Sequence, residues 1–364
     1  MSVHSIYLDA NATTPLSREV MAEMMPALAE HFANPSSVHK PGQDARALVD
    51  AARERCARAL GCAAREIIFT SGGTESDALA LLGARPRKIV TTAVEHPAVL
   101  GACAAAPECV RVSVLPSGEL DLEELRRALP SASICSVMAA NNETGVVFPL
   151  REVAALCREA GVPLHVDAVQ AAGKMPLDFP WDLLSLSAHK IRGPKGAGLL
   201  ASRVKLAPVQ AGGHQERGRR AGTENVAGIV GMGAALERAV AAQPADEVRL
   251  RALRDRLEAA ASEIPHAHVA GRSVSRVCNT LNVAFAGCDG ETLLAALDLE
   301  GISVSTGSAC SSGSLEPSPV LLAMGYAKEL ARGAVRFSLW SGNTDQEIAR
   351  VCDVLPRVVA RARG

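Results

Sequence analysis

The chain has 364 residues, 48% of them hydrophobic and 21% charged, and this length predicts about two domains with a large core. Its formal net charge of −1 argues against a general nucleic-acid-binding protein, because no basic excess is available to neutralise phosphates. The N-terminus lacks a basic segment followed by a long apolar one, and the apolar residues 226–236 are too few to span a bilayer. The simplest expectation is a cytoplasmic protein that acts on neither membranes nor nucleic acid.

From residue 43 to about residue 250 the predicted elements alternate between helix and strand. Gly61 and Gly161 are expected to stop two of the helices, and Asp121 is expected to cap a third. Alternation of this kind indicates an α/β fold with a mainly parallel sheet between helices. Helices are predicted over 43–60, 75–82, 122–129 and 151–160, and strands over 66–70, 88–93, 133–140, 163–168 and 182–187.

After about residue 250 the pattern changes to that of a smaller α+β domain. We therefore predict a large domain over 15–250, and a small domain formed by 1–14 together with 251–364. Within the second part we predict a charged helix over 251–261, strands over 279–285 and 335–339, and a loop rich in Gly and Ser over 301–314.

Lys190 follows directly on the apolar strand 182–187, a costly place for a lysine. Such a lysine is either a surface residue with a buried stem or a functional amine. Asp167 lies at the end of another apolar strand, the one that comes before the strand 182–187 along the chain. A lysine amine near a carboxylate is what a pyridoxal phosphate (PLP) enzyme requires, because the amine forms the Schiff base and the carboxylate keeps the pyridine nitrogen protonated.

Other polar residues also follow predicted strands, where open α/β sheets bind their ligands. The turn 71–74 precedes a helix, and the free N–H groups of a helix N-terminus attract phosphate, although a plain tight turn would look the same. His96 could stack on a PLP ring and an amide at Asn142 could bind its phenolic oxygen, but structural roles in turns remain open for both. The residues at predicted strand ends are Thr74, His96, Asn142, Asp167, Gln170 and Lys190.

The ten cysteines contain no CxxC pair, so neither a zinc site nor a redox pair is indicated. Most, such as Cys56, are expected to be small buried hydrophobic residues in a reducing compartment. Cys310 differs because it lies in the small-residue segment 305–314, which has no apolar periodicity to bury it. We interpret it as a reactive thiol. In the same part of the chain, Arg336 could bind a substrate carboxylate with two hydrogen bonds or form a surface ion pair.

A set of motifs resembles those of the cysteine desulfurases of the NifS/IscS type. The resemblance runs from residue 7 to about residue 340. It implies class V aminotransferase architecture, that is PLP fold type I, in a homodimer with active sites at the subunit interface. The motifs are residues 7–15, 34–39, 69–76, 141–145, 187–190, 219–225 and 307–317.

The resemblance also implies roles for individual residues. Lys190 would be the Schiff-base lysine, Asp167 would pair with the pyridine nitrogen, and His96 would stack on the ring. Asn142 and Gln170 would contact the side of the ring that carries the phenolic oxygen. Arg336, helped by Asn142, would take the substrate carboxylate. The phosphate would be held by Gly73, Thr74, Ser187 and His189, with Thr223 reaching it from the partner subunit.

In the implied reaction L-cysteine is converted to L-alanine, with Lys190, Cys310 and His96 as catalytic residues. The Cys310 thiolate would attack the substrate sulfur and become a persulfide, which then passes to an acceptor protein such as an iron–sulfur scaffold. No resident metal is implied, apart from a passing role for Cys310 as a cluster ligand during transfer. Trp340 departs from the family pattern, in which we expect a smaller residue.

Two other interpretations remain open from the sequence. One is another fold-type-I PLP enzyme, such as an aminotransferase or a selenocysteine lyase; an aminotransferase would leave Cys310 incidental. The other is a catalytically idle binding subunit, which the presence of Lys190, Asp167 and Cys310 disfavours. The acceptor is not specified, because iron–sulfur assembly, tRNA thiolation and DNA sulfur modification all draw on such enzymes.

Overall fold

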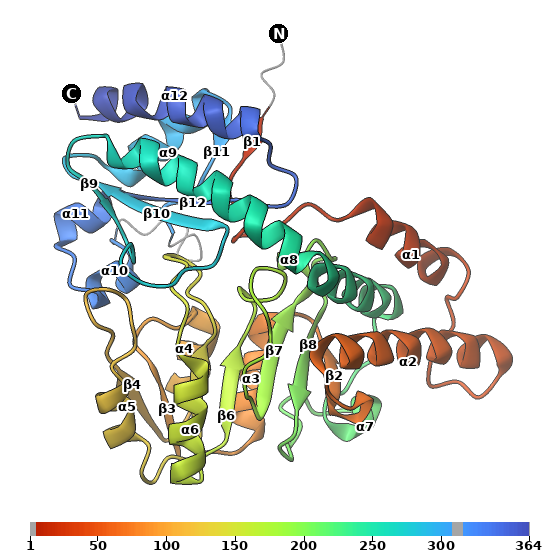
Figure 1. Cartoon of the computed structure of the whole chain (residues 1–364). Coiled ribbons are helices and arrows are strands. Elements are labelled where there is room, and N and C mark those ends of the chain that lie inside the picture. The colour runs from red at the N-terminus through yellow and green to blue at the C-terminus, as the bar shows by residue number, and fades with distance from the viewer. Residues whose placement is uncertain (1–4, 308–315, 364) are drawn as a thin grey trace.

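A seven-stranded sheet forms the centre of the larger part of the molecule (Figure 1). The structure is a computed structural model that describes residues 5–307 and 316–363. The strand order is β2-β8-β7-β6-β5-β3-β4, in which β8 is antiparallel to both of its neighbours and the other pairs are parallel. The predicted α/β fold with a mainly parallel sheet is therefore confirmed. The strands are β2 (Ile67–Thr70), β3 (Lys88–Thr92), β4 (Glu108–Val112), β5 (Ile134–Met138), β6 (Leu164–Asp167), β7 (Leu183–Ser187) and β8 (Gly198–Ser202).

Helices cover both faces of this sheet, so its central strands are apolar throughout. In β7, Leu184 and Leu186 face a core shared with α2, α6 and α8, whereas Leu183 faces a second core shared with α3 and α4. Burial on both faces explains why these strands appear in the sequence as continuous apolar runs. The helices of this part are α1 (Arg18–Ala29), α2 (Lys40–Leu60), α3 (Gly73–Gly83), α4 (Pro97–Ala104), α5 (Leu122–Ala128), α6 (Leu150–Ala160), α7 (Gln215–Gly218) and α8 (Val226–Ser262).

The predicted helix ends are confirmed by their local geometry. Asp121 accepts a hydrogen bond from the backbone N–H of Glu124 and so caps α5. Gly61 and Gly161 end α2 and α6 in the left-handed conformation, with φ of 62° and 68°. Glycine adopts this conformation without the steric cost that other residues incur.

The rest of the chain builds a second core around a small antiparallel sheet of order β12-β10-β9. The beginning of the chain joins this part, because β1 pairs in parallel with β11. Leu8, Phe285 and Phe337 are among the fully buried side chains of this core. The elements are β1 (Ile6–Tyr7), β9 (Ala267–Val269), β10 (Thr280–Phe285), β11 (Ile302–Ser303), β12 (Ala334–Ser338), α9 (Gly290–Leu299), α10 (Pro319–Ala323), α11 (Lys328–Arg332) and α12 (Asp345–Ala362).

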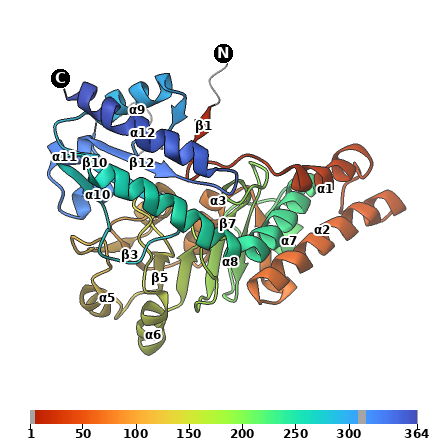
Figure 2. The ribbon, with the colours of Figure 1, turned by 45° about the horizontal axis from the view of Figure 1, so that its top comes forward.

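Helix α8 passes from the larger part to the smaller one, as Figures 1 and 2 show. The helix predicted over 251–261 is only its last section, and the expected boundary near residue 250 lies inside it. The first part of α8 was not predicted as a helix, because its sequence is rich in glycine. A Cβ on Gly231 would lie 2.7 Å from Met24 Sδ, and one on Gly233 would lie 3.1 Å from the Cα atom of Ala52. These glycines therefore let α1 and α2 pack closely on α8, while the two-domain division stays a prediction.

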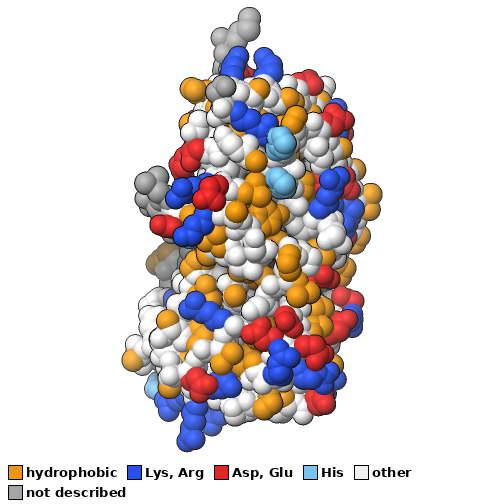
Figure 3. All heavy atoms as spheres, turned by 90° about the vertical axis from the view of Figure 1, so that its left-hand side faces the viewer, with side chains coloured by type: hydrophobic (Ala, Val, Ile, Leu, Met, Phe, Trp, Pro, Cys, Tyr) orange, Lys and Arg blue, Asp and Glu red, His pale blue; other side chains and the backbone are white. Residues whose placement is uncertain are grey.

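The molecular surface carries charges of both signs. On the face shown in Figure 3, basic and acidic side chains are interspersed with apolar ones. Within residues 5–307 and 316–363, no helix is both long enough and apolar enough to cross a membrane.

Candidate active site

A cavity of about 360 Å³ lies where β5, β6 and β7 end and α3 begins. We call it the strand-end cavity. The carboxyl ends of parallel strands meet at one edge of a sheet, so residues distant in sequence converge there. Most of the predicted site residues line it, namely Gly73, Thr74, His96, Asn142, Asp167, Gln170, Ser187, His189, Lys190 and Arg336.

Lys190 ends a short 3-10 helix, Ala188–Lys190, that directly follows β7. Its amine donates to the backbone carbonyl of Asn11 at 2.5 Å and to that of Ala12 at 2.8 Å. The N-terminal segment therefore holds the amine at the cavity wall by two neutral acceptors. The predicted alternative of a surface lysine is wrong, because the amine points into the protein.

Asp167, at the end of β6, and His96, after β3, face the same cavity from two strands that are separated by β5. Asp167 is 6% exposed, and one of its carboxylate oxygens accepts from the backbone N–H of Val169 at 2.9 Å. Burial raises the pKa of Asp167, although His96 and Lys190 oppose the shift. His96 caps α4, and its Nδ1 accepts from the N–H of Ala98 at 3.1 Å. In the neutral ring the proton is therefore on Nε2.

The turn before α3 forms one end of the site. Gly72 has φ of 156°, a conformation that residues with a side chain rarely adopt, and a Cβ on Gly73 would lie 3.0 Å from Val169. The helix that starts here has 11 residues, and its first turn leaves backbone N–H groups without partners inside the helix. Ser187, Thr74 and His189 line the adjoining hollow together with this turn. These groups are suited to an anion.

His189 is neutral at physiological pH. Burial, followed by the charges of Lys190 and Lys195, lowers the pKa of His189 to about 4. Its Nδ1 shares a hydrogen bond of 3.1 Å with the hydroxyl of Thr13. The ring therefore offers a hydrogen bond, and not a charge, to a ligand in the hollow.

Arg336 is 2% exposed and comes from the smaller part of the chain. It donates to Asp9 at 2.7 Å and to the backbone carbonyl of Asn142 at 3.0 Å. Its Nε is buried and finds no hydrogen-bond partner among the described residues. The ion pair that was one predicted alternative does form, with Asp9, but the Arg336 side chain is 3% exposed and so does not lie on the surface. The guanidinium is fixed in the cavity wall and keeps an unused donor.

Two of the predicted site residues are not among the described residues that line this cavity. Cys310 lies outside the described residues. Gly307, three residues earlier, does line the cavity. Thr223 is exposed and does not belong to the described lining, so its role toward a partner subunit stays a prediction.

Sequence analysis assigned no role to three residues that shape the site. Asn11 accepts hydrogen bonds from the amines of Lys190 and Lys174 and from the side-chain amide of Gln170. Lys174 is buried and also donates to Gln170, four residues earlier. Asp77 lines the cavity from α3. Two features of the sequence could have indicated Asn11 and Lys174 as site residues. Asn11 is a polar residue among small ones, and Lys174 follows Gln170 by four positions.

Comparison with known proteins agrees with this geometry. The aminotransferase class-V family profile matches residues 6–351. The chain is 46% identical to the cysteine desulfurase NifS of Azotobacter vinelandii, covering 99% of this chain and 94% of the relative. It is 44% identical to the cysteine desulfurase IscS of Methanosarcina thermophila, covering 99% of this chain and 93% of the relative. A solved structure described as a NifS-like protein superimposes with a TM-score of 0.91 at 35% identity, over 98% of this chain and 100% of the other.

The chain therefore belongs to the aminotransferase class-V family, whose NifS-like members generally depend on PLP. Within that family it groups with the cysteine desulfurases of the NifS and IscS type, as its motifs predicted.

Proposed function

We propose that the protein binds PLP and converts L-cysteine to L-alanine, taking the sulfur onto Cys310 as a persulfide and passing it to an acceptor protein. The observation that carries the proposal is the strand-end cavity, which combines the Lys190 amine, the buried Asp167 carboxyl group and the Arg336 guanidinium. No single one of these groups specifies the reaction. Together they provide an amine for the Schiff base, a carboxyl group to keep the pyridine nitrogen protonated, and a guanidinium to bind the substrate carboxylate.

The residues present fit PLP. Asp167 is a carboxyl group buried at the cavity wall, and a protonated pyridine nitrogen would stabilise its charged form. The glycine turn and the start of α3 form a cradle for the phosphate, from which Cβ atoms are absent at Gly72 and Gly73. Lys190 supplies the amine that the aldehyde of PLP requires. When bound, PLP supplies an electron sink for the substrate α-carbon.

The protein's own groups would then position the substrate and move protons. Arg336 keeps its buried Nε for the substrate carboxylate, while its two other contacts to Asp9 and Asn142 fix the plane of the guanidinium. With PLP bound, the Lys190 amine would be the group that takes a proton from the substrate α-carbon and returns it in forming alanine. The carbonyls of Asn11 and Ala12 are its acceptors on the opposite side.

Sulfur transfer depends on Cys310. Gly307, three residues before Cys310 in the sequence, lines the cavity, and this supports the proposed role of Cys310. Attack of its thiolate on the substrate sulfur breaks the substrate C–S bond and forms an S–S bond, and the electron pair of the broken bond remains on the substrate carbon, which is protonated to alanine. A reductant or an acceptor thiol then removes the sulfur from Cys310.

We further propose a homodimer as the functional unit. Apolar side chains are exposed along α1 and the segment that follows it, including Phe32 at 83% and Val38 at 88% exposed. Met21, Met25 and Leu28 extend this surface along one helix, which is more than isolated exposure explains. A second copy covering it would place a subunit boundary near the N-terminal segment of the site. Thr223, exposed in this chain, is the residue that we propose to reach the partner's phosphate.

The acceptor and the cellular location stay predictions. A cytoplasmic location is supported by the nine described cysteines, all of which are free of disulfides. A scaffold protein of iron–sulfur assembly is the acceptor that we propose.

The test is alanine and sulfide formation from L-cysteine by purified protein with PLP and dithiothreitol. We expect equal amounts of both products from the wild type, loss of both in Lys190→Ala, and retention in Lys205→Ala, which alters an exposed lysine. Alanine that appears only when a keto acid is added would instead identify an aminotransferase.

A further inference from the structure

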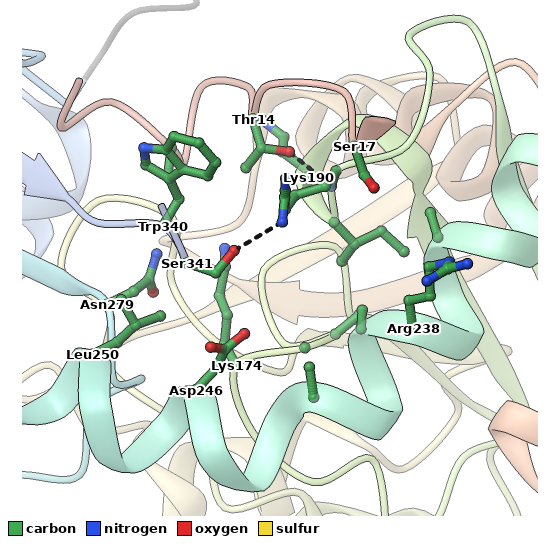
Figure 4. A pocket seen from close by; sticks show the side chains of 18 of the residues that line it. Thr14, Ser17, Lys174, Lys190, Arg238, Asp246, Leu250, Asn279, Trp340 and Ser341 are labelled. Carbon is green, nitrogen blue, oxygen red and sulfur yellow. Dashed lines mark hydrogen bonds between the residues drawn. The ribbon is translucent and has the colours of Figure 1, made fainter. Parts of the chain in front are cut away.

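A second cavity of about 290 Å³ lies on the other side of Lys190. We call it the rear cavity. Figure 4 shows that α8 forms its floor, with Asp246 and Leu250, while Trp340 and Ser341 from the smaller part lie on one side and Arg238 on the other. Lys190 lines both cavities, so the rear cavity adjoins the catalytic lysine without being part of the substrate site.

One wall of the rear cavity carries two basic side chains, and burial lowers the pKa of one of them, Lys174, to about 7, so that a nearby carboxylate would favour its charged form. Lys174 is 7% exposed and lies in the lining. Arg192 also lines the cavity, and its Nε is buried without a hydrogen-bond partner among the residues that the structure describes. Unsatisfied buried donors of this kind are rare in proteins and are commonly used by a ligand or water. A carboxylate at this wall would satisfy the Nε of Arg192 and could share the amine of Lys174, which already donates to Asn11 and Gln170.

Trp340, where the sequence analysis expected a smaller residue, lines this cavity. The Arg192 guanidinium carbon lies 5.2 Å from the centre of the Trp340 ring, and Arg192 also donates to the Ser341 hydroxyl at 3.4 Å. Stacking of this type orients the guanidinium and leaves its edge available for an anion. The Trp340 ring itself forms an apolar wall of the cavity.

Besides Arg238 and several uncharged polar side chains, the remaining lining includes acidic and apolar residues. Asp246 and Glu19 contribute carboxylates. Among the residues that the structure describes, the ion pair found for Asp246 is a long one, to Arg249 on the same helix at 4.0 Å. Ala239 and Leu250 add apolar surface beside Trp340. A cavity with cationic, anionic and apolar parts matches a molecule that has a carboxylate, an amino group and a short apolar side chain.

We propose that the rear cavity binds a small zwitterionic amino acid, with its carboxylate held by Lys174 and Arg192 and its ammonium group by Asp246. This site is separate from the substrate site and does not depend on the proposed desulfurase activity. Lys174 also donates to Asn11, whose backbone carbonyl accepts from Lys190. An occupant that attracts the Lys174 amine therefore acts on the group that holds the catalytic lysine.

The probe is N,N-dimethylglycine added to the PLP-loaded enzyme. It is zwitterionic, but its tertiary amine cannot condense with an aldehyde, so it cannot react with PLP. Binding is followed by tryptophan emission and by calorimetry. The chain has two tryptophans, and Trp181 is buried in the core of the larger part. A saturable change in emission that disappears in Trp340→Phe, with calorimetric binding retained, is expected.

Charge recognition is tested with ligands and variants. We expect acetate and dimethylammonium to bind at least about tenfold more weakly than the zwitterion, since each lacks one charged contact. Lys174→Met and Asp246→Asn are each expected to weaken binding about tenfold as well. Lys40→Met and Asp353→Asn, which alter exposed residues, are matched controls and should bind normally.

Three results would overturn the proposal. One is the absence of saturable calorimetric binding to the wild type. Another is acetate binding as tightly as the zwitterion, because the amino group would then not be recognised. The third is loss of binding in Arg336→Lys together with normal binding in Asp246→Asn, since this would place the probe in the strand-end cavity. The ligand comparison uses only wild-type protein, so it remains decisive even where a variant folds poorly.

Discussion

Glu95 is a buried carboxyl group whose protonation should control how stability depends on pH. It is 4% exposed, and its Oε1 accepts from the N–H of Met138 and from the hydroxyl of Thr92, each at 2.9 Å. Its Oε2 is buried and has no partner within the described part of the chain. Burial, assisted by the charge of Asp167, raises the pKa of Glu95 from 4.5 to about 8.

The sign of the effect follows from proton uptake. Between pH 4.5 and 8 the folded protein keeps a proton on Glu95 that the unfolded chain has released. The contribution of Glu95 to stability is therefore largest at low pH and is lost as the pH rises toward 8. Each pH unit in this range corresponds to about 1.4 kcal/mol, so the loss between pH 5 and pH 8 is roughly 3 kcal/mol. Glu95→Gln has the shape of the protonated acid and should not show this loss.

The assay is urea unfolding of wild type and Glu95→Gln at several pH values from 5 to 8. The expected result is that the free energy of unfolding of the variant, relative to the wild type, increases by roughly 3 kcal/mol over this range. Glu152→Gln, at an exposed position on α6, is the matched control and should run parallel to the wild type. A constant difference between Glu95→Gln and wild type would refute the reasoning, because Glu95 would then be charged in the folded protein.

Three further predictions concern a buried ion pair and two groups of the site. Arg53→Ala should cost about 3–5 kcal/mol in urea unfolding, since it leaves Glu216 buried without its two hydrogen bonds of 2.8 Å; a cost under about 1 kcal/mol would contradict a buried pair. Arg336→Lys should raise KM for L-cysteine at least about tenfold in steady-state kinetics, because a lysine cannot reproduce the planar fork, and an unchanged KM would exclude carboxylate binding. Gly72→Ala should weaken PLP binding in equilibrium dialysis. Gly61→Ala is the control, because Gly61 is also at positive φ but has open space around it; this variant should lower stability by about 1 kcal/mol and leave PLP affinity unchanged. Equal PLP affinity in both variants would argue against a phosphate cradle at Gly72.

The central strands could be predicted from sequence because burial on both faces makes them continuous apolar runs. The same physics located the site, since Asp167 is the polar last residue of β6 and Lys190 is a charged residue three positions after the end of β7. Strand ends converge whatever lies between them in sequence, so most of the predicted cavity lining is found together.

What was missed depends on contacts between distant segments. The first half of α8 has an apolar, glycine-rich sequence, because it is packed on α1 and α2, and it therefore lacks the amphipathic period of a surface helix. Asn11 precedes the first long helix and follows no strand of the central sheet, so no local pattern placed it beside Lys190. The contact of Trp340 with Arg192 joins residues 148 positions apart by their numbers. Such contacts follow from tertiary packing alone.

The most direct test of the central claim is a comparison of wild type and Cys310→Ala after incubation with L-cysteine in the absence of reductant. The account predicts that mass spectrometry of the wild type shows one added sulfur atom on the peptide that contains Cys310, in an amount matched by the alanine released. Cys310→Ala should retain bound PLP, acquire no sulfur and release no alanine beyond the level of Lys190→Ala. Undiminished alanine release by Cys310→Ala would contradict the account, because the sulfur would then leave the substrate without the Cys310 thiol.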